Sequence, residues 1–371
     1  MQAYDLSALN TQLLLLAFGI GAAFGAIAQR THFCTMGAVS DAFNMGDWTR
    51  MRQWGLALGV AMLGFAGLVY AGQVDPTQVL YASNRWLWLS AVLGGLMFGL
   101  GMVLASGCGS KTLVRIGGGS LKSVVVLLVL GLAAFATLKG ITAVLRVATI
   151  DRVVVDLPMG TGLAQWVAGR WGLPPALTAL VLGLALGGSL VVWVLADRDF
   201  RSPANLLAGV GIGGLVVAMW WVSGHLGHVS EHPETLQETF LATNSGRAEA
   251  LSFVAPVAYL LDWLLFFSDK NKLLTMGITS TAGVVLGSLL AALANRSFRW
   301  EGFGSTEDLA NHLVGAVLMG VGGVAAMGCT IGQGLSGLST LNATSVVAVL
   351  GILTGAVAGL SYQAWRVDRA S

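Results

Sequence analysis

The chain has 371 residues, of which 55% are hydrophobic and only 10% charged, and its formal net charge is +2. A soluble domain carries about 25% charged residues, so the composition excludes an ordinary soluble enzyme, and no basic stripe suggests a nucleic-acid partner. The apolar runs are long and do not alternate. They therefore predict membrane-spanning helices rather than barrel strands, because a helix crosses a bilayer with roughly 20 apolar residues.

Ten apolar segments follow one another along the chain, and we expect about nine of them to cross the bilayer completely. The exception is 251–267, which is short and carries Asp262 in its middle. A polar stretch, 223–250, is expected to be a solvated loop with one short surface helix. The whole chain, 1–371, is expected to form one integral membrane domain. The segments lie near residues 12–29, 53–72, 87–106, 121–145, 174–196, 204–222, 251–267, 273–294, 311–328 and 343–362.

Three connections differ from ordinary loops. Residues 30–44, 107–120 and 329–342 are short, rich in Gly, Ser and Thr, and lie beside apolar helices. Irregular backbone is tolerated at membrane depth only where it is buried in protein or lines a wet cavity. We therefore predict re-entrant segments or half-helices at these three places.

The two halves of the chain, about 1–197 and 203–371, resemble each other. Aligning Cys108 with Cys329 gives seven identities in the fifteen positions that end at the cysteines, without a gap. Transporters are often built from such repeats, with the substrate site at the repeat interface. If the repeats are inverted, the helices that end at the two cysteines run in opposite directions. Cys34 has Ser223 as its expected counterpart in the second half.

Each of the three cysteines, Cys34, Cys108 and Cys329, lies where an apolar helix gives way to small polar residues. A single buried cysteine is usually inert, but three of them, with two in matched positions, favour a functional site. Adjacent glycines let a ligand approach the backbone. A helix that begins after the break would offer N–H groups to an anion. The candidate supporting residues are Arg30, Gly107, Gly109, Ser110, Lys111, Arg115, Gly328, Thr330 and Gly332.

Two alternatives stay open for the cations. Lys111 and Arg115 either attract an anion or lie at the interface, where long basic side chains commonly extend to the headgroups; His32 is expected to be structural. No cysteine lies in a CxxC motif or a Cys/His cluster with metal spacing. We expect no metal and no cofactor.

At the cysteines the chain resembles the YeeE/YedE family of sulfur-compound transporters, whose characterised members take up thiosulfate. The resemblance covers essentially the whole chain, and it is most specific at 106–117 (SGCGSKTLVRIG), at 328–337 (GCTIGQGLSG) and at 30–34 (RTHFC). It implies an hourglass-shaped helical protein that is indented from both membrane faces. It also implies that thiosulfate passes between the three thiols by transient hydrogen bonds, without covalent change.

The resemblance also implies partners and a location. We expect a multi-pass protein of the bacterial inner membrane that works with a separate, small cytosolic sulfurtransferase-like protein, since the chain ends soon after its last apolar segment. The motifs do not distinguish thiosulfate from other sulfur or selenium species. Two further alternatives are a membrane thiol-disulfide oxidoreductase, which would use a paired low-pKa cysteine motif, and a soft-metal transporter, which would use CxxC or Met-rich spacing.

A divalent anion that enters a cell moves against the membrane potential. Each charge costs about 2.3 kcal/mol per 100 mV, so two charges cost roughly 4.6 kcal/mol. Uptake is therefore expected to depend on rapid consumption inside the cell or on coupling to protons. Asp262 is the one intramembrane carboxylate that the sequence offers as a proton carrier.

Overall fold

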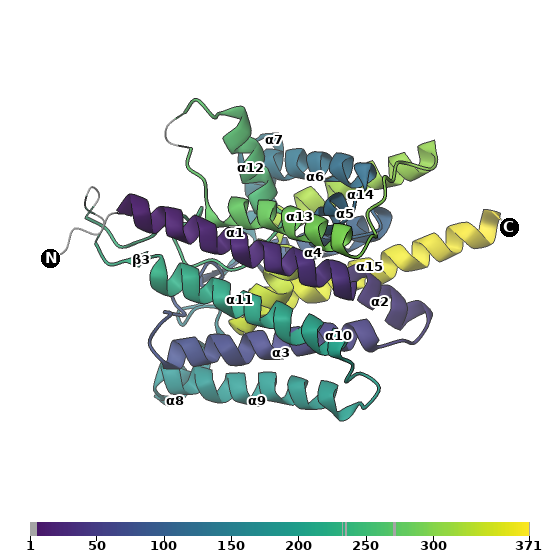
Figure 1. The fold of residues 1–371 in the computed structure, drawn as a ribbon. Coiled ribbons are helices and arrows are strands. Elements are labelled where there is room, and N and C mark those ends of the chain that lie inside the picture. Colours follow the sequence, from purple (N-terminus) through teal and green to yellow (C-terminus); the bar gives the residue numbers. More distant parts are fainter. Residues whose placement is uncertain (1–5, 232, 234–235, 270–271, 371) are drawn as a thin grey trace.

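The computed structural model describes residues 6–231, 233, 236–269 and 272–370, and these are mostly helical (Figure 1). Nine helical segments in this part of the chain are long and apolar enough to cross a membrane. The expected all-α polytopic architecture with about nine crossings is confirmed. The crossings are α1 (Leu6–Thr31), α3 (Thr49–Tyr70), α4 (Trp88–Leu104), α6 (Leu121–Lys139), α9 (Pro175–Ala196), the run of α10 (Pro203–Leu206), η2 (Leu207–Gly211), α11 (Ile212–Trp221) and η3 (Val222–Leu226), then α13 (Met276–Ala294), α14 (Thr306–Ala325) and α15 (Ala343–Ala370).

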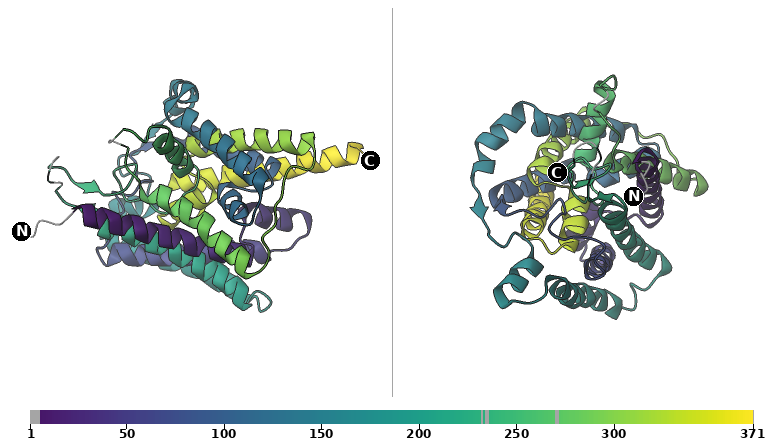
Figure 2. Two further views of the ribbon diagram at one scale, coloured as in Figure 1. Left: turned by 45° about the horizontal axis from the view of Figure 1, so that its top comes forward. Right: turned by 90° about the vertical axis from the view of Figure 1, so that its left-hand side faces the viewer.

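The shorter helices follow the crossings or lie in the connections between them. The helices α2 (Thr35–Asn44) and α5 (Gly109–Gly117) continue directly from α1 and α4 after a break, as half-helices. The suspect segment 251–267 contains only α12 (Ala255–Leu265), too short to cross, as expected. The remaining short helices are α7 (Ile141–Ala148), η1 (Ile150–Arg152), α8 (Leu163–Trp171) and η4 (Gly332–Gly337). The long helices run roughly along one axis, and seen end-on they surround the C-terminal segment (Figure 2).

Two small antiparallel sheets stand in the connections. Strand β1 (Arg85–Trp86) pairs with β2 (Val155–Asp156), with Arg85 opposite Asp156, and β3 (His228–Val229) pairs with β4 (Thr239–Phe240), with His228 opposite Phe240. The second sheet occupies the stretch 223–250, where the sequence predicted a short surface helix. That prediction was wrong for the described residues: only 223–226, the end of η3, are helical. Residues 232 and 234–235 of this stretch lie outside the described part.

One predicted segment is divided. Residues 121–145 form α6 and α7, which are separated at Gly140 in an extended conformation (φ −106°, ψ −154°). Apolar composition continues across the division, so hydropathy alone did not show it. A β-carbon at Gly140 would lie 2.9 Å from the carbonyl oxygen of Ala136, so only glycine allows this turn without a shift of the backbone.

The centre of the bundle is held by glycine contacts between α4 and α14. A β-carbon on Gly94 would lie 2.7 Å from the oxygen of Gly322, and one on Gly101 would lie 2.7 Å from the oxygen of Gly315. The lower-numbered glycine of α4 faces the higher-numbered glycine of α14, so the two helices run antiparallel. An inverted repeat requires this crossing, but the repeat and its two halves stay a prediction.

The same contacts give the first testable expectation. Replacing Gly322 by leucine forces a side chain into the α4 backbone, so we expect it to destabilise the protein by about 3 kcal/mol or more. Gly214 has nothing within 4 Å of its β-carbon position, so Gly214→Leu is the matched control and is expected to leave stability almost unchanged. Thermal unfolding in one detergent measures both. Equal unfolding temperatures for the two variants would contradict the packing described here.

Candidate functional site

The three cysteines follow three breaks of the same geometry. Two residues before each cysteine, the backbone turns into the left-handed region: φ is 54° at His32, 54° at Ser106 and 56° at Met327. After α4 and α14 the next N–H group turns back and bonds a carbonyl five residues earlier, each at 2.8 Å. This is how helices commonly end, but usually with glycine in the left-handed position. Non-glycine residues there are strained and persist only where the surroundings enforce them.

The cysteine sulfur atoms lie at the N-termini of new helical segments. Cys34 is the N-cap of α2, and its Sγ accepts the N–H of Gly37 at 3.4 Å. Cys329 Sγ accepts the N–H of Gly332 at 3.4 Å, and the N–H groups of Phe253 and Ile331 also face it. An oxygen atom commonly fills the N-cap position. Here a thiol fills it, beside N–H groups that can also bind an anion.

Cys108 is the neighbour that the other two thiols share. It is the N-cap of α5, with its Sγ 3.3 Å from the Oγ of Ser110, a predicted supporting residue. It lies close enough to interact electrostatically with both Cys34 and Cys329. All three thiols are free and buried, and Cys108 is only 1% exposed. The fold therefore gathers three cysteines that are separated by up to 295 positions in the sequence.

The predicted glycines lie against neighbouring groups of the chain. A β-carbon on Gly109 would stand 3.1 Å from the carbonyl oxygen of Phe253, and one on Gly332 would stand 2.7 Å from the Oγ of Ser252. These two glycines let the segment before α12 approach the second and third breaks. A β-carbon on Gly107 would stand 3.2 Å from the Cγ of Lys111, and one on Gly328 would stand 3.1 Å from both the Cγ and the backbone nitrogen of Gln333.

After Cys329 the chain forms the π-helical segment η4 (Gly332–Gly337). Tyr81 donates to the Gly332 carbonyl at 2.6 Å, and the Gln333 amide donates to the Ala326 carbonyl at 2.5 Å. Such wide turns are frequent at functional sites. The Oγ1 of Thr330, another predicted residue, is buried and has no hydrogen-bond partner among the residues that the structure describes. Buried polar atoms are almost always satisfied, so this hydroxyl is available to a ligand or a water molecule.

A cationic cavity of about 450 Å³ lies beside the first two breaks. We call it the cationic pocket; its lining includes His32, Lys111, Arg115 and Arg299. Its one acidic residue, Glu301, is paired with Lys122 at 3.0 Å. In the described residues no carboxylate forms an ion pair with any of its Lys and Arg side chains. The structure thus brings Lys111 and Arg115 together, whereas Arg30 is exposed and does not line the cavity.

The sequence missed two contributors to this pocket. His32 was expected to be structural only, although its side chain lines the cavity. Arg299 reaches it because the N–H of Arg299 bonds the Gly118 carbonyl at 3.0 Å, which holds the loop after α13 against the end of α5. This contact joins segments that are far apart in the sequence, and no local motif indicates it.

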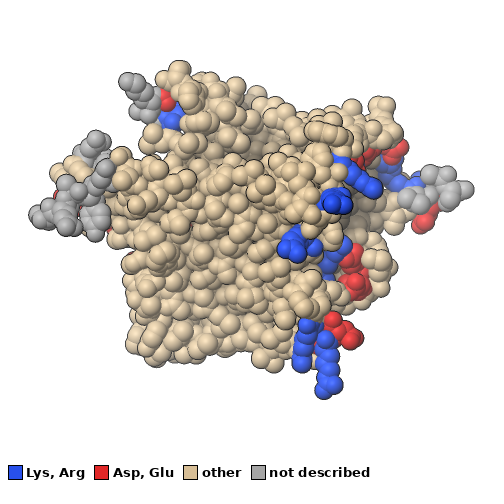
Figure 3. Space-filling view, viewed as in Figure 1, with Lys and Arg blue, Asp and Glu red and all other residues tan. Residues whose placement is uncertain are grey.

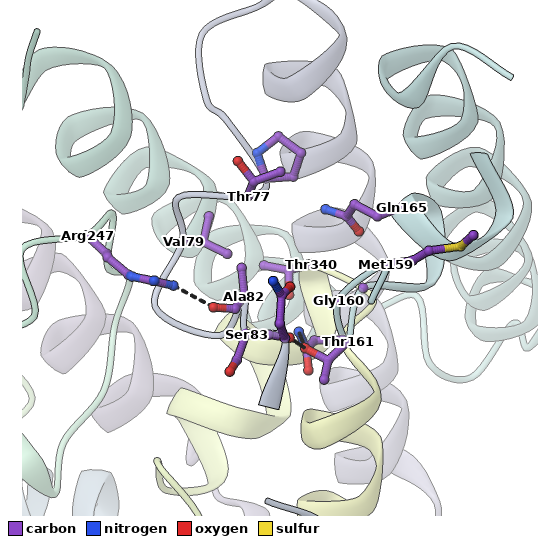
Figure 4. Close-up of a pocket in the computed structure, with 14 residues that line it drawn as sticks. Thr77, Val79, Ala82, Ser83, Met159, Gly160, Thr161, Gln165, Arg247 and Thr340 are labelled. Carbon is purple, nitrogen blue, oxygen red and sulfur yellow. Dashed lines mark hydrogen bonds between the residues drawn. The ribbon is translucent and has the colours of Figure 1, made fainter. Parts of the chain in front are cut away.

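A second polar cavity, of about 190 Å³, is lined by the connections that follow α3 at the opposite end of the bundle, and Figure 4 shows its lining residues. Thr77, Ser83, Thr161, Gln165 and Arg247 contribute to its lining, and the Arg247 guanidinium donates to the Ala82 carbonyl at 2.5 Å. No cysteine lines this cavity or the cationic pocket. The protein therefore has a polar recess towards each end and buried thiols in the packed region between them.

Two predicted residues differ from expectation. Ser223 is not at a break: it lies in η3 at the end of an unbroken helix, and its Oγ donates to the Glu249 carbonyl at 2.5 Å. The residue that stands at the N-cap of the half-helix α12 is Val254, so Ser223 does not occupy the position that the cysteines occupy.

The Asp262 carboxylate is bound by Lys139 at 2.8 Å and by Lys272 at 2.7 Å. Two lysines hold this carboxylate as an ion, so it is a poor proton carrier.

Comparisons with known proteins identify a matching family and several similar chains. A family model described as sulphur transport matches residues 30–358. The thiosulfate transporter TsuA of Escherichia coli (strain K12) is 28% identical over 325 residues, which cover 85% of this chain and 84% of that protein. The TsuA protein of Spirochaeta thermophila is 26% identical over 345 residues, 91% of this chain and 94% of that protein. The probable transporter YedE of Escherichia coli (strain K12) is 32% identical over 110 residues, which cover 30% of this chain and 26% of that protein.

Proposed function

The chain belongs to the sulphur transport family, which confirms the resemblance drawn from its cysteine motifs, and on this premise we propose that it takes up thiosulfate, or a closely related small sulfur-containing anion, across the bacterial inner membrane. The anion passes between the thiols of Cys34, Cys108 and Cys329 by transient hydrogen bonds, without covalent change. Both TsuA relatives are thiosulfate transporters by name, which favours thiosulfate over other sulfur or selenium species.

The observation that carries the proposal is the shared position of Cys108. One thiol within electrostatic range of the other two gives a short route with three stations. Each station combines a polarizable, weak S–H donor with N–H or hydroxyl groups nearby. A small anion can exchange its hydrogen bonds along this route without a continuous aqueous pore.

The distribution of basic residues supports one orientation. Lys and Arg gather at the end of the bundle where α1 and α15 end (Figure 3). Loops on the cytoplasmic side carry an excess of Lys and Arg. The cationic pocket then opens to the cytoplasm, and the cavity near Arg247 opens to the periplasm. The loops that contribute to the basic end include Arg198, Arg201, Arg296 and Arg299.

The cytoplasmic end also fits the expected partner. A small sulfurtransferase-like protein that removes thiosulfate at the cationic pocket would keep the internal concentration low. Uptake then proceeds against the membrane potential because the ion is consumed. Proton coupling is the other possible driving force, and the two are separable by experiment.

The test is uptake of radiolabelled thiosulfate by a bacterium that lacks its own thiosulfate transporters and expresses this protein. We expect saturable uptake, competed by excess unlabelled thiosulfate. Removing the proton gradient and the sulfurtransferase together is expected to stop accumulation. Accumulation that continues unchanged after both are removed would refute the mechanism, and the absence of any uptake with the protein present in the membrane would refute the substrate.

A further inference from the structure

Glu249 is a carboxyl group that the route described above does not use. It lies on the segment that enters the bundle before α12, between the buried residues Ala248 and Leu251, and is itself partly exposed. Its backbone is fixed to the end of η3, since Ser223 Oγ donates to the Glu249 carbonyl at 2.5 Å and accepts its N–H at 3.2 Å. Its carboxylate Oε1 accepts the N–H of Ser245 at 2.8 Å.

No Lys, Arg or His forms an ion pair with Glu249 in the part of the chain that the structure describes. This distinguishes it from Asp262, which two lysines hold as an ion. Arg247, two residues earlier, directs its guanidinium to the Ala82 carbonyl at the periplasmic cavity. Burial raises the pKa of the Glu249 carboxyl above its usual range.

The surroundings connect Glu249 to the third thiol. The titratable groups that face it are Tyr81 and Tyr259. Tyr81 faces Cys329 as well, and its hydroxyl bonds the Gly332 carbonyl at 2.6 Å, while the Gly332 N–H bonds Cys329 Sγ at 3.4 Å. On the segment that carries Glu249, the N–H of Phe253 also faces Cys329.

We propose that Glu249 binds the proton that accompanies the anion past Cys329, so that thiosulfate and a proton move inward together. This rests on the proposed function. Because Tyr81 faces both Cys329 and Glu249, a divalent anion at Cys329 repels an ionised Glu249 carboxylate across this side chain, and a proton on Glu249 removes that repulsion. Each ligand therefore favours binding of the other, by the same factor. One proton also cancels one of the two charges that the membrane potential opposes.

The experiment uses the full chain in proteoliposomes, with thiosulfate at a limiting concentration and a pH-sensitive dye inside. We expect wild-type uptake to fall about tenfold as the external pH rises through the raised titration range of Glu249, because deprotonated Glu249 opposes anion binding. Glu249→Gln keeps the acceptor for Ser245 but cannot titrate, so its uptake is expected to be nearly independent of pH. A thiosulfate gradient is expected to acidify the interior with wild type and not with Glu249→Gln.

The matched control is Glu238→Gln. Glu238 is an exposed carboxyl of the same stretch and is bound by His228 and Gln78, and we expect its variant to keep the wild-type pH dependence and the acidification. Wild-type uptake without internal acidification would overturn the proposal and leave the proposed function intact, whether or not the Gln variant folds. Glu249→Gln with wild-type pH dependence would also overturn it. A wild type that transports no thiosulfate would refute the proposed function itself.

Discussion

Replacing Cys108 by alanine is expected to abolish growth of a sulfur-auxotrophic bacterium on thiosulfate as sole sulfur source. The thiol is within electrostatic range of both other thiols, so no route that uses all three stations avoids it. A hydrogen bond to a charged group contributes about 1.5–3 kcal/mol. Losing it at the shared station corresponds to a fall in uptake of roughly 10- to 100-fold. Cys34→Ala and Cys329→Ala are expected to reduce uptake similarly.

Serine at the same positions separates the mechanisms. A hydroxyl donates and accepts hydrogen bonds, so Cys108→Ser is expected to retain part of the uptake if the anion is relayed without covalent change. A thiol-disulfide oxidoreductase or a soft-metal transporter would lose all activity in the serine variant, because neither redox chemistry nor metal capture survives the change.

The control for these variants is Ser280→Ala. Ser280 is buried and similar in size to cysteine, and within the described part of the chain its hydroxyl bonds only the Gly277 carbonyl of its own helix, at 2.9 Å. We expect normal growth at equal membrane levels. If Cys108→Ala grows like this control, the thiol relay is wrong.

The sequence predicted the features of this protein that local composition determines. Apolar length predicted the crossings, and glycine beside Cys108 and Cys329 marked two of the three breaks. A chain that must end one helix and begin another within a few residues favours small residues there. Asp262 in a short apolar run correctly indicated the incomplete crossing that became α12. Each of these features can be predicted from the sequence because it depends on residues that lie next to one another along the chain.

The rest depends on contacts between distant segments. Ser223 matched the spacing of a cysteine position but lies in an unbroken helix, since spacing from a glycine does not record where a helix ends. Glu249 looked like one acid among several in a polar loop, yet the segment that carries it is packed against η3 and Tyr81. Arg299 reaches the cationic pocket only through its backbone bond to Gly118. Hydropathy and motif spacing contain no information about such pairings.

Lys111 and Arg115 give the second large expected effect. Both line the cationic pocket beside the first two breaks, and both lie within electrostatic range of Cys34. Two unit charges about 7 Å apart at an effective dielectric constant of about 20 interact by roughly 2.4 kcal/mol. Solvent at the mouth of the pocket screens part of this, so about 1.4 kcal/mol per cation is a reasonable expectation. That energy corresponds to a tenfold change in rate.

We therefore expect Lys111→Met to lower the maximal rate of uptake about tenfold and the double variant with Arg115→Gln to lower it further. Methionine keeps an unbranched, flexible stem beside Gly107 and removes only the charge. Lys122→Met is the matched control, because Lys122 lies at the same end but is already neutralised by Glu301 at 3.0 Å; we expect a change below about twofold. Radiolabelled thiosulfate uptake at equal membrane levels measures all three. If Lys111→Met and Lys122→Met behave alike, the unpaired charge of Lys111 does not draw the anion inward, and Lys111 is an interfacial anchor.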